Sequence, residues 1–216
     1  EEEIEKDKLK DPIIVFENTC IKEKIIKKEE FNKIYEEIKN QVDQDAEWAE
    51  LQENPNPINS MKNIYSENDI SFKTPKNVGD KIVLVDAVNH ALEEELAYNK
   101  KMLVYGQDIA GGKGGVFTAT RGLTDKFGKD RVFNSPLAES SIIGTAIGLS
   151  TLGYKPVIEI QFGDYIWTSM MQIRNEVATM RYRSNGDWTC PIVMRVPVGG
   201  YIHGSLCHSQ SIEGYF

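Results

Sequence analysis

The first third of this 216-residue chain contains no glycine and no arginine. All 17 glycines lie from Gly79 onward, and every arginine lies from Arg121 onward. Residues 1–75 carry 19 acidic and 11 basic side chains, whereas residues 76–216 carry 14 of each, so the whole formal charge of −8 belongs to the first stretch. The chain therefore consists of two stretches of different composition.

Other absences exclude whole classes of protein. No apolar run approaches the roughly 18 residues that a membrane helix needs, and the longest, Cys190–Val198, is interrupted by Pro191, Arg195 and Pro197. The acidic balance argues against a nucleic-acid partner, which would require a basic stripe. The three cysteines lie far apart, without disulfide or zinc spacing, and Glu1–Lys10 lacks the apolar core of a signal peptide. We expect a cytoplasmic protein with no membrane segment and no resident metal.

The glycine-free stretch predicts helices. Asp11-Pro12 is a favourable helix start, because proline is tolerated in the first turn, and we expect the four apolar residues that follow to pack together. Apolar residues three or four apart predict a long helix over 29–51, ended by Asn54-Pro55-Asn56-Pro57. Residues 58–80 show no periodicity and are predicted to be a linker. We therefore expect residues 1–57 to form a helical extension.

From Lys81 onward, short apolar strands alternate with helices. Strands are predicted at 102–105, 131–133, 156–160 and 191–196, and helices at 85–98, 123–127, 139–152 and 165–182. This alternation is typical of an α/β fold, a mostly parallel sheet with helices on both faces. In such a fold ligands bind at the loops that follow the carboxyl ends of the strands. We therefore expect one α/β domain over 81–216 with its site in these loops.

Three of these loops contain side chains capable of chemistry. Glu139 opens a predicted helix, so it is either a carboxylate favoured by the helix dipole or one held in a dry cleft. Tyr165 is either a core residue or a flat face for a ring to stack on. The glycine-rich stretch Gly199–Ser211 carries two of the three histidines, His203 and His208, and has too few apolar residues for a core. These patterns alone leave both interpretations of each residue open.

One helix pattern has two interpretations of its own. Gly144 and Gly148 lie one helical turn apart in the predicted helix 139–152. They permit close packing of the helix on a strand within the domain, which we favour. They also permit close contact between helices of two subunits.

Taken together, the loop sequences resemble one family. The ordered motifs are Asp86-Ala87-Val88, Gly106-Gln107-Asp108, Gly114-Gly115-Val116-Phe117, Arg131-Val132-Phe133-Asn134-Ser135-Pro136-Leu137-Ala138-Glu139, Glu159-Ile160-Gln161-Phe162-Gly163-Asp164-Tyr165, Arg181-Tyr182-Arg183-Ser184-Asn185-Gly186 and His208-Ser209-Gln210-Ser211. They resemble the β subunit of thiamine-diphosphate-dependent 2-oxoacid dehydrogenases, the E1 component, and are most similar to the branched-chain type. The resemblance covers about residues 81–216 and implies the pyrimidine-binding domain of that subunit.

The resemblance implies roles for five residues. Glu139 matches the glutamate that hydrogen-bonds N1′ of the cofactor's aminopyrimidine and drives it to the imino tautomer, whose 4′ nitrogen removes the thiazolium C2 proton. Tyr165 matches the aromatic residue that stacks on the pyrimidine. His208 matches the histidine that assists at the substrate and in acyl transfer to lipoamide. Gln161 and Gln107 are expected in the cofactor pocket, although Gln107 replaces the glutamate of the common Gly-Glu-Asp motif.

Glu139 in that role needs a protonated or proton-sharing carboxyl group, which burial in an apolar pocket favours. Leu137, Ile142 and Ile143 are expected to supply such a pocket, because they flank Glu139 in the sequence.

The other half of the cofactor site is expected elsewhere. The family holds Mg²⁺ and the diphosphate with a Gly-Asp-Gly motif in its α part, and no such motif occurs here. The acidic extension resembles the tail of the α subunit, which implies a fused α–β chain of which this is an internal fragment. The implied partners are an E1 α-type domain, a lipoyl-bearing E2 acyltransferase, a 2-oxo acid and further copies of the full-length protein. We expect the fragment alone to bind thiamine diphosphate weakly or not at all and to be inactive.

Two alternatives remain open on the sequence. A transketolase-type thiamine enzyme shares the glutamate and the domain but lacks the His-Ser-Gln-Ser loop. A non-catalytic assembly or regulatory domain could keep the fold without the reaction.

Overall fold

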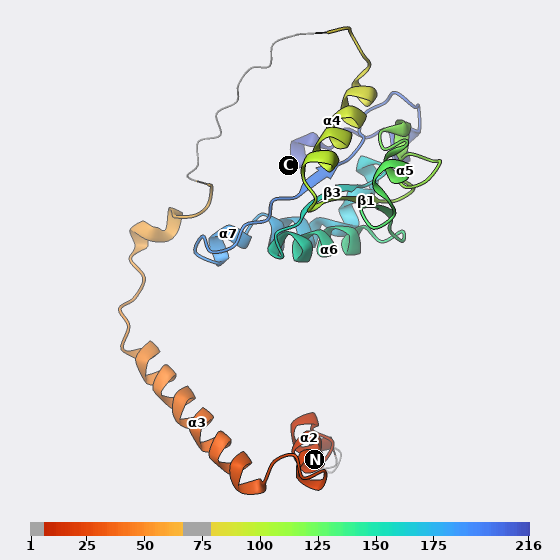
Figure 1. Ribbon diagram of the computed structural model, residues 1–216. Helices are drawn as coiled ribbons and strands as arrows, with labels where there is room; N and C mark the ends of the chain where they lie inside the picture. The colour runs from red at the N-terminus through yellow and green to blue at the C-terminus, as the bar shows by residue number, and fades with distance from the viewer. Residues whose placement is uncertain (1–6, 67–78) are drawn as a thin grey trace. The chain divides into compact units, whose positions relative to one another are not determined.

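The computed structural model describes residues 7–66 and 79–216 (Figure 1). The chain divides into two compact units, residues 1–59 and residues 60–216, which we call the helical unit and the α/β unit. Residues 67–78 of the predicted linker lie outside the described residues. Within the described part of that linker, the 3-10 helix η1 spans Pro57–Met61, and Asn63 Nδ2 donates to Asn185 Oδ1 at 3.0 Å.

The helical unit contains two α-helices. Helix α2 spans Pro12–Lys22, and the Asp11 side chain accepts a hydrogen bond from the Ile13 N–H at 2.8 Å, which confirms the predicted start. Helix α3 spans Lys28–Glu50, one residue from the predicted bounds at each end. The Tyr35 hydroxyl lies 3.4 Å from the Glu17 carboxylate and joins the two helices.

The expected packing of the apolar residues of α2 is wrong. Ile13, Ile14, Val15 and Phe16 are all exposed, and Cys20 is the one buried residue among those described in this unit. The physical reason is that two helices without a sheet or a third helix have too little surface to enclose four consecutive apolar side chains. These residues point around the whole circumference of α2, and α3 can cover only one side.

The α/β unit is built on a parallel sheet of four strands in the order β2-β1-β3-β4. The strands are β1 (Met102–Gly106), β2 (Val132–Asn134), β3 (Lys155–Glu159) and β4 (Val193–Arg195). All three strand pairs are parallel, which confirms the predicted fold class. Every residue of β1 is buried, as expected for a central strand covered on both faces.

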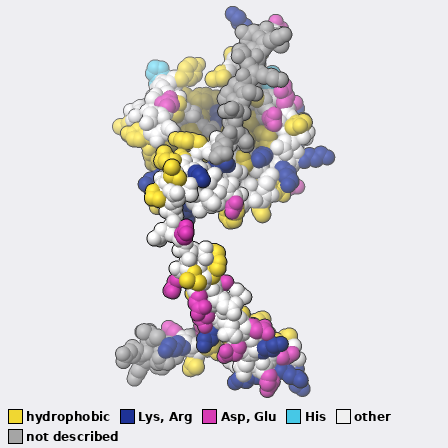
Figure 2. Space-filling view, turned by 90° about the vertical axis from the view of Figure 1, so that its left-hand side faces the viewer, with side chains coloured by type: hydrophobic (Ala, Val, Ile, Leu, Met, Phe, Trp, Pro, Cys, Tyr) yellow, Lys and Arg dark blue, Asp and Glu magenta, His cyan; other side chains and the backbone are white. Residues whose placement is uncertain are grey.

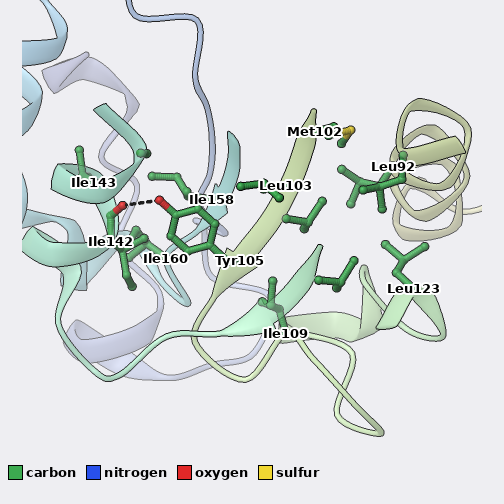
Figure 3. Packing of buried hydrophobic residues seen from close by; sticks show 14 of the residues in the cluster. Leu92, Met102, Leu103, Tyr105, Ile109, Leu123, Ile142, Ile143, Ile158 and Ile160 are labelled. Carbon is green, nitrogen blue, oxygen red and sulfur yellow. Dashed lines mark hydrogen bonds between the residues drawn. The ribbon is translucent and has the colours of Figure 1, made fainter. Parts of the chain in front are cut away.

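Helices cover the two faces of this sheet. Helix α6 (Glu139–Thr151) packs on β3, whereas α4 (Leu84–Tyr98) packs on β1 and α5 (Leu123–Phe127) packs on β2. Figure 3 shows β1 side chains between Ile142 and Ile143 of α6 on one side and Leu92 and Leu123 on the other. The Tyr105 hydroxyl donates to the Ile142 carbonyl at 3.0 Å and ties the first turns of α6 to the sheet.

The prediction of one continuous helix over residues 165–182 is wrong. The segment forms a 3-10 helix, η3 (Gly163–Ser169), then a π-helix, η4 (Gln172–Val177), then one turn of α-helix, α7 (Met180–Arg183). Hydroxyl groups explain part of the irregularity, because Ser169 donates to the Ile166 carbonyl at 2.7 Å and Thr179 donates to the Asn175 carbonyl. Such side-chain bonds compete with the regular α-helical ladder.

The remaining elements are short. The 3-10 helix η2 spans Val116–Thr118, the helical turn α8 spans Ser205–His208, and η5 spans Glu213–Tyr215. Helix α8 lies in the stretch Gly199–Ser211, for which no regular structure was predicted. Among the described residues, no helix is long and apolar enough to cross a membrane.

Candidate functional site

The carboxyl ends of all four strands lie at one edge of the sheet. The register pairs Gly106 with both Asn134 and Glu159, and it pairs Glu159 with Arg195. A Cβ atom on Gly106 would lie 2.3 Å from the Glu159 carbonyl oxygen, so the close approach of β1 and β3 requires glycine at this position. The loops after the strands therefore converge, as predicted from the alternation of strands and helices.

Glu139 lies at this edge, as the first residue of α6. The helix has no side-chain cap at Ala138, so the positive end of its dipole favours the carboxylate. Gln107 Nε2 donates to Glu139 Oε1 at 3.0 Å, and the Thr168 hydroxyl lies 3.3 Å from Glu139 Oε2. Each carboxylate oxygen thus has a neutral donor from a different segment of the chain.

The surroundings of Glu139 differ from the expected apolar pocket. Ile142 and Ile143 are buried, but they belong to the core between α6 and the sheet. Leu137 is 80% exposed and does not enclose the carboxylate. Glu139 itself is half-buried. The expectation for Leu137 is wrong for this chain, because the turn before α6 directs that side chain to the surface.

Tyr165, on η3, lies beside His208. The Tyr165 hydroxyl is 2.6 Å from His208 Nε2, and the ring of Phe162 contacts the imidazole edge-on with centroids 4.6 Å apart. Phe162 also meets Tyr165 edge-on, with centroids 5.8 Å apart. The short α8 turn and the loop after β3 therefore bring two of the predicted residues into direct contact.

Thr168 links these two groups of residues. Its hydroxyl lies 3.3 Å from Glu139 Oε2 and 3.3 Å from the carbonyl oxygen of Tyr165. The Ser140 hydroxyl donates to the Thr168 carbonyl at 2.5 Å, which fixes η3 against the start of α6. Thr168 was not predicted, and a lone threonine in an expected helix carries no signal that would have identified it.

Gln161 takes a different position from Gln107. Its Nε2 donates to Asp108 Oδ2 at 3.1 Å, and Asp108 Oδ1 pairs with Lys113 Nζ at 2.8 Å. Gln161 thus lies at the same edge of the sheet but contacts the glycine-rich loop rather than Glu139. Of the five predicted residues, Gln107 and Glu139 form one contact, Tyr165 and His208 form another, and Gln161 joins neither.

A buried ion pair, not predicted, lies beside the site. Glu159 is 2% exposed, and its Oε2 is 2.7 Å from Arg195 Nη2. Val116 is held from both sides, since its N–H donates to Glu159 Oε1 at 3.1 Å and its carbonyl accepts from Arg195 Nη2 at 3.2 Å. Burial raises the pKa of Glu159, although Arg195 opposes this. The sequence did carry a signal for this ion pair, namely one charged residue within each of two otherwise apolar predicted strands.

Two cavities adjoin the aromatic group. The larger, about 990 Å³, is lined mainly by apolar side chains, with Phe162, Phe117, His208 and Arg195 among them. The smaller, about 480 Å³, is lined by Tyr165 and by Trp167, Cys207 and neighbouring residues. Figure 2 shows hydrophobic side chains gathered around a hollow on one face of the α/β unit. Glu139 lines neither cavity, so the tyrosine–histidine pair borders the larger spaces and the carboxylate does not.

The arrangement supports proton handling but shows no metal centre. Over residues 7–66 and 79–216, no three His, Cys, Asp or Glu side chains are grouped to hold a metal ion. The chemical groups available are a carboxylate with two neutral donors, an imidazole paired with a phenol, and adjoining apolar space. Such a set suits binding of an aromatic heterocycle with polar ring atoms.

Residues 80–216 match the protein family described as "Transketolase, pyrimidine binding domain". The chain is 51% identical over 132 residues to the 2-oxoisovalerate dehydrogenase subunit beta of Bacillus subtilis, covering 61% of this chain and 40% of that protein. It is 46% identical over 134 residues to the pyruvate dehydrogenase E1 component subunit beta of the same organism, covering 62% and 41%.

A mitochondrial 2-oxoisovalerate dehydrogenase subunit beta of Dictyostelium discoideum is 46% identical over 144 residues, which covers 65% of this chain and 38% of that protein. The chain therefore spans about two fifths of the length of these relatives.

Proposed function

The chain belongs to the family of transketolase pyrimidine-binding domains, and on that basis we propose that it forms the pyrimidine-binding part of a 2-oxoacid dehydrogenase E1. The observation that carries this proposal is the contact set around Glu139. A carboxylate at a helix start, with Gln107 on one oxygen and Thr168 on the other, lies next to η3. The same η3 carries Tyr165, whose hydroxyl contacts His208 of α8. The relatives named as E1 beta subunits support the same assignment.

The residues present fit the pyrimidine half of thiamine diphosphate. Glu139 is half-buried, so a ring nitrogen can approach its carboxylate from the open side. Gln107 Oε1 is buried and has no hydrogen-bond partner within the described residues, which marks a polar position that is still unsatisfied. Tyr165 is half-buried on η3 and offers an aromatic surface there. We propose that these residues hold the aminopyrimidine ring.

When bound, thiamine diphosphate supplies the electron sink that permits decarboxylation of a 2-oxo acid. Glu139 would bind N1′ of the pyrimidine and hold the shared proton at one of its carboxylate oxygens. His208 is fixed by Tyr165 through its Nε2 atom and by the Phe162 ring, so its imidazole is oriented before any substrate arrives. In this proposal His208 holds or moves a proton at the edge of the larger cavity.

The partners are part of the proposal. An E1 α-type domain would hold Mg²⁺ and the diphosphate, since the chain has no Gly-Asp-Gly motif. The full-length protein would pass the acyl group to a lipoyl-bearing E2 and associate with further copies of itself. We propose that the helical unit, which lies outside the matched residues 80–216, is the tail of such an α part. The proposed substrate is a branched-chain 2-oxo acid.

The test is the change Glu139→Ala in the full-length E1 enzyme, with its α part and its β part both present. We expect decarboxylation of 2-oxoisovalerate to fall by a factor of about 100 or more, because a positioned acid–base group contributes on that order. The readout is CO₂ release with an artificial electron acceptor, which does not depend on E2.

The matched control is Glu94→Ala, which removes an exposed glutamate on α4 and is expected to leave the rate unchanged. Decarboxylation by Glu139→Ala within tenfold of the native rate would contradict the role of Glu139. Turnover of a ketose phosphate in place of any 2-oxo acid would instead assign the protein to the transketolase type.

A further inference from the structure

Gln107 has a buried side-chain amide, whose nitrogen and oxygen differ in their hydrogen bonding. The side chain is 1% exposed and lies directly after β1. Its Nε2 donates to Glu139 Oε1 at 3.0 Å, while its Oε1 has no hydrogen-bond partner among the residues that the structure describes. A buried acceptor without a partner lowers stability, so the favourable contact of this side chain is the one to Glu139.

The Gln107 contact differs from the Thr168 contact on the other oxygen. Thr168 is exposed, and its hydroxyl lies equally close to Glu139 and to the Tyr165 carbonyl, so it can turn from one to the other. The Gln107 amide is enclosed and cannot be replaced by water without a change in packing. Gln107 is therefore the fixed donor to the carboxylate.

We propose that Gln107 is a positioning residue that sets the orientation of the Glu139 carboxylate. A hydrogen bond donated to a carboxylate favours its ionised form, and a neutral amide does so without adding a charge. The amide thereby fixes Oε1 and leaves Oε2, which is more weakly held, to face a ligand. This inference rests on the proposed role of Glu139, but its test needs neither cofactor nor partner.

No charged group competes with Gln107 for the Glu139 carboxylate. Glu139 is the one charged residue of α6. Titratable or charged groups occur on each segment packed against α6, but none of them hydrogen-bonds or pairs with the Glu139 carboxylate. These groups are Tyr105 on β1, Asp108 after it, Lys155 and Glu159 on β3, Asp164 and Tyr165 on η3, and Arg174 and Glu176 on η4.

The first test uses the native chain. With ¹³C-labelled glutamate carboxyl groups and ¹⁵N-labelled glutamine amides, the Glu139 carboxyl carbon and the Gln107 side-chain NH₂ are followed by NMR from pH 3 to 8. We expect the Gln107 resonances to move with the same midpoint as Glu139. Gln107 resonances that stay constant through the Glu139 titration would overturn the proposal, and this result requires no variant to fold.

The second test compares three variants by the same titration. Gln107→Met removes the donor and should raise the Glu139 midpoint by about half a pH unit or more. Gln107→Glu places a second carboxyl at the same position and should raise it by about one unit or more, in two coupled steps. Gln172→Met removes another amide, whose buried oxygen has no hydrogen-bond partner among the described residues, and should leave the midpoint unchanged, because the carboxylate of Glu139 accepts from Gln107 and Thr168. An unchanged midpoint in Gln107→Met would overturn the proposal.

The Glu139 midpoint could shift in Gln107→Met while the native full-length E1 shows no decarboxylation of a 2-oxo acid. That result would support the positioning role of Gln107 and contradict the proposed function. The two failures are therefore distinguishable.

Discussion

Helix α3 is exposed along almost its whole length, whereas helix α6 packs into the core of its unit. Helix α3 has 23 residues with a regular apolar face, yet none of its residues is buried. Helix α6 has 13 residues and buries four of them, because β1 and β3 lie beneath it. The comparison shows that apolar spacing states which face of a helix is apolar, whereas a covering layer decides whether that face contributes to a core.

The largest expected effect concerns charge, and it contrasts a buried and an exposed ion pair within the α/β unit. We expect Arg195→Met to destabilise the α/β unit by about 3–5 kcal/mol at pH 7, because it leaves Glu159 buried without its counter-charge. The exposed pair Arg183–Glu176 gives the control, since Arg183→Met should cost less than about 1 kcal/mol. The measurement is urea unfolding followed by tryptophan fluorescence.

The pH dependence of this effect has a defined sign. Burial raises the pKa of Glu159, so the folded chain holds that proton more tightly than the unfolded chain. Its contribution to stability is therefore greatest at acid pH and is lost as the pH rises through the raised pKa. Arg195→Met removes a group that lowers this pKa, so its destabilisation should be smaller at pH 5 than at pH 7. Equal destabilisation at both pH values would contradict this explanation.

The next effect compares apolar side chains of similar size in the two units. Ile158→Ala in β3, where the side chain is fully buried, should destabilise the α/β unit by about 2–5 kcal/mol. Ile38→Ala in α3, where the side chain is 57% exposed, should change stability by less than about 0.5 kcal/mol. Urea unfolding of both variants tests this. A comparable loss from Ile38→Ala would show that α3 is covered by a partner in solution.

The smallest effect concerns an exposed face of α6. Gly144 and Gly148 are exposed and a Cβ on either meets no atom within 4 Å, so the favoured prediction of close packing on a strand is wrong. Gly144→Ala should therefore stabilise the chain by up to about 1 kcal/mol. Gly106→Ala, whose Cβ would lie 2.3 Å from a carbonyl oxygen, should destabilise it. A less stable Gly144→Ala variant with altered sedimentation would indicate contact between copies.

Much of the fold was predictable because its signals are local. The start of α2 at Asp11-Pro12, the bounds of α3, the four strands and the helices α4 and α5 follow from caps, spacing and glycine positions. The segment 165–182 was not predictable, because competition between hydroxyl groups and the helical ladder depends on the packing around it.

The sequence predicted which residues belong to the site better than it predicted the contacts between them. Glu139, Tyr165 and His208 were named from the order of motifs, and the structure brings Tyr165 and His208 within 2.6 Å. The pairing of Gln107 with Glu139 joins residues 32 positions apart, and no local pattern encodes it. Glu159 and Arg195 were missed because each belongs to a different strand and gains meaning only when β3 and β4 pair.

The sequence by itself determined the two compositions, the periodicity of the helices, the parallel α/β class and the motifs that resemble one family. These depend on residues close together along the chain, where spacing and backbone preference act directly. The tertiary structure decided which apolar faces are buried, which oxygen of Glu139 accepts from Gln107, and which charge is placed against Arg195. These depend on strands and loops that meet only when the sheet forms, because hydrogen bonds and ion pairs are set by distance in space.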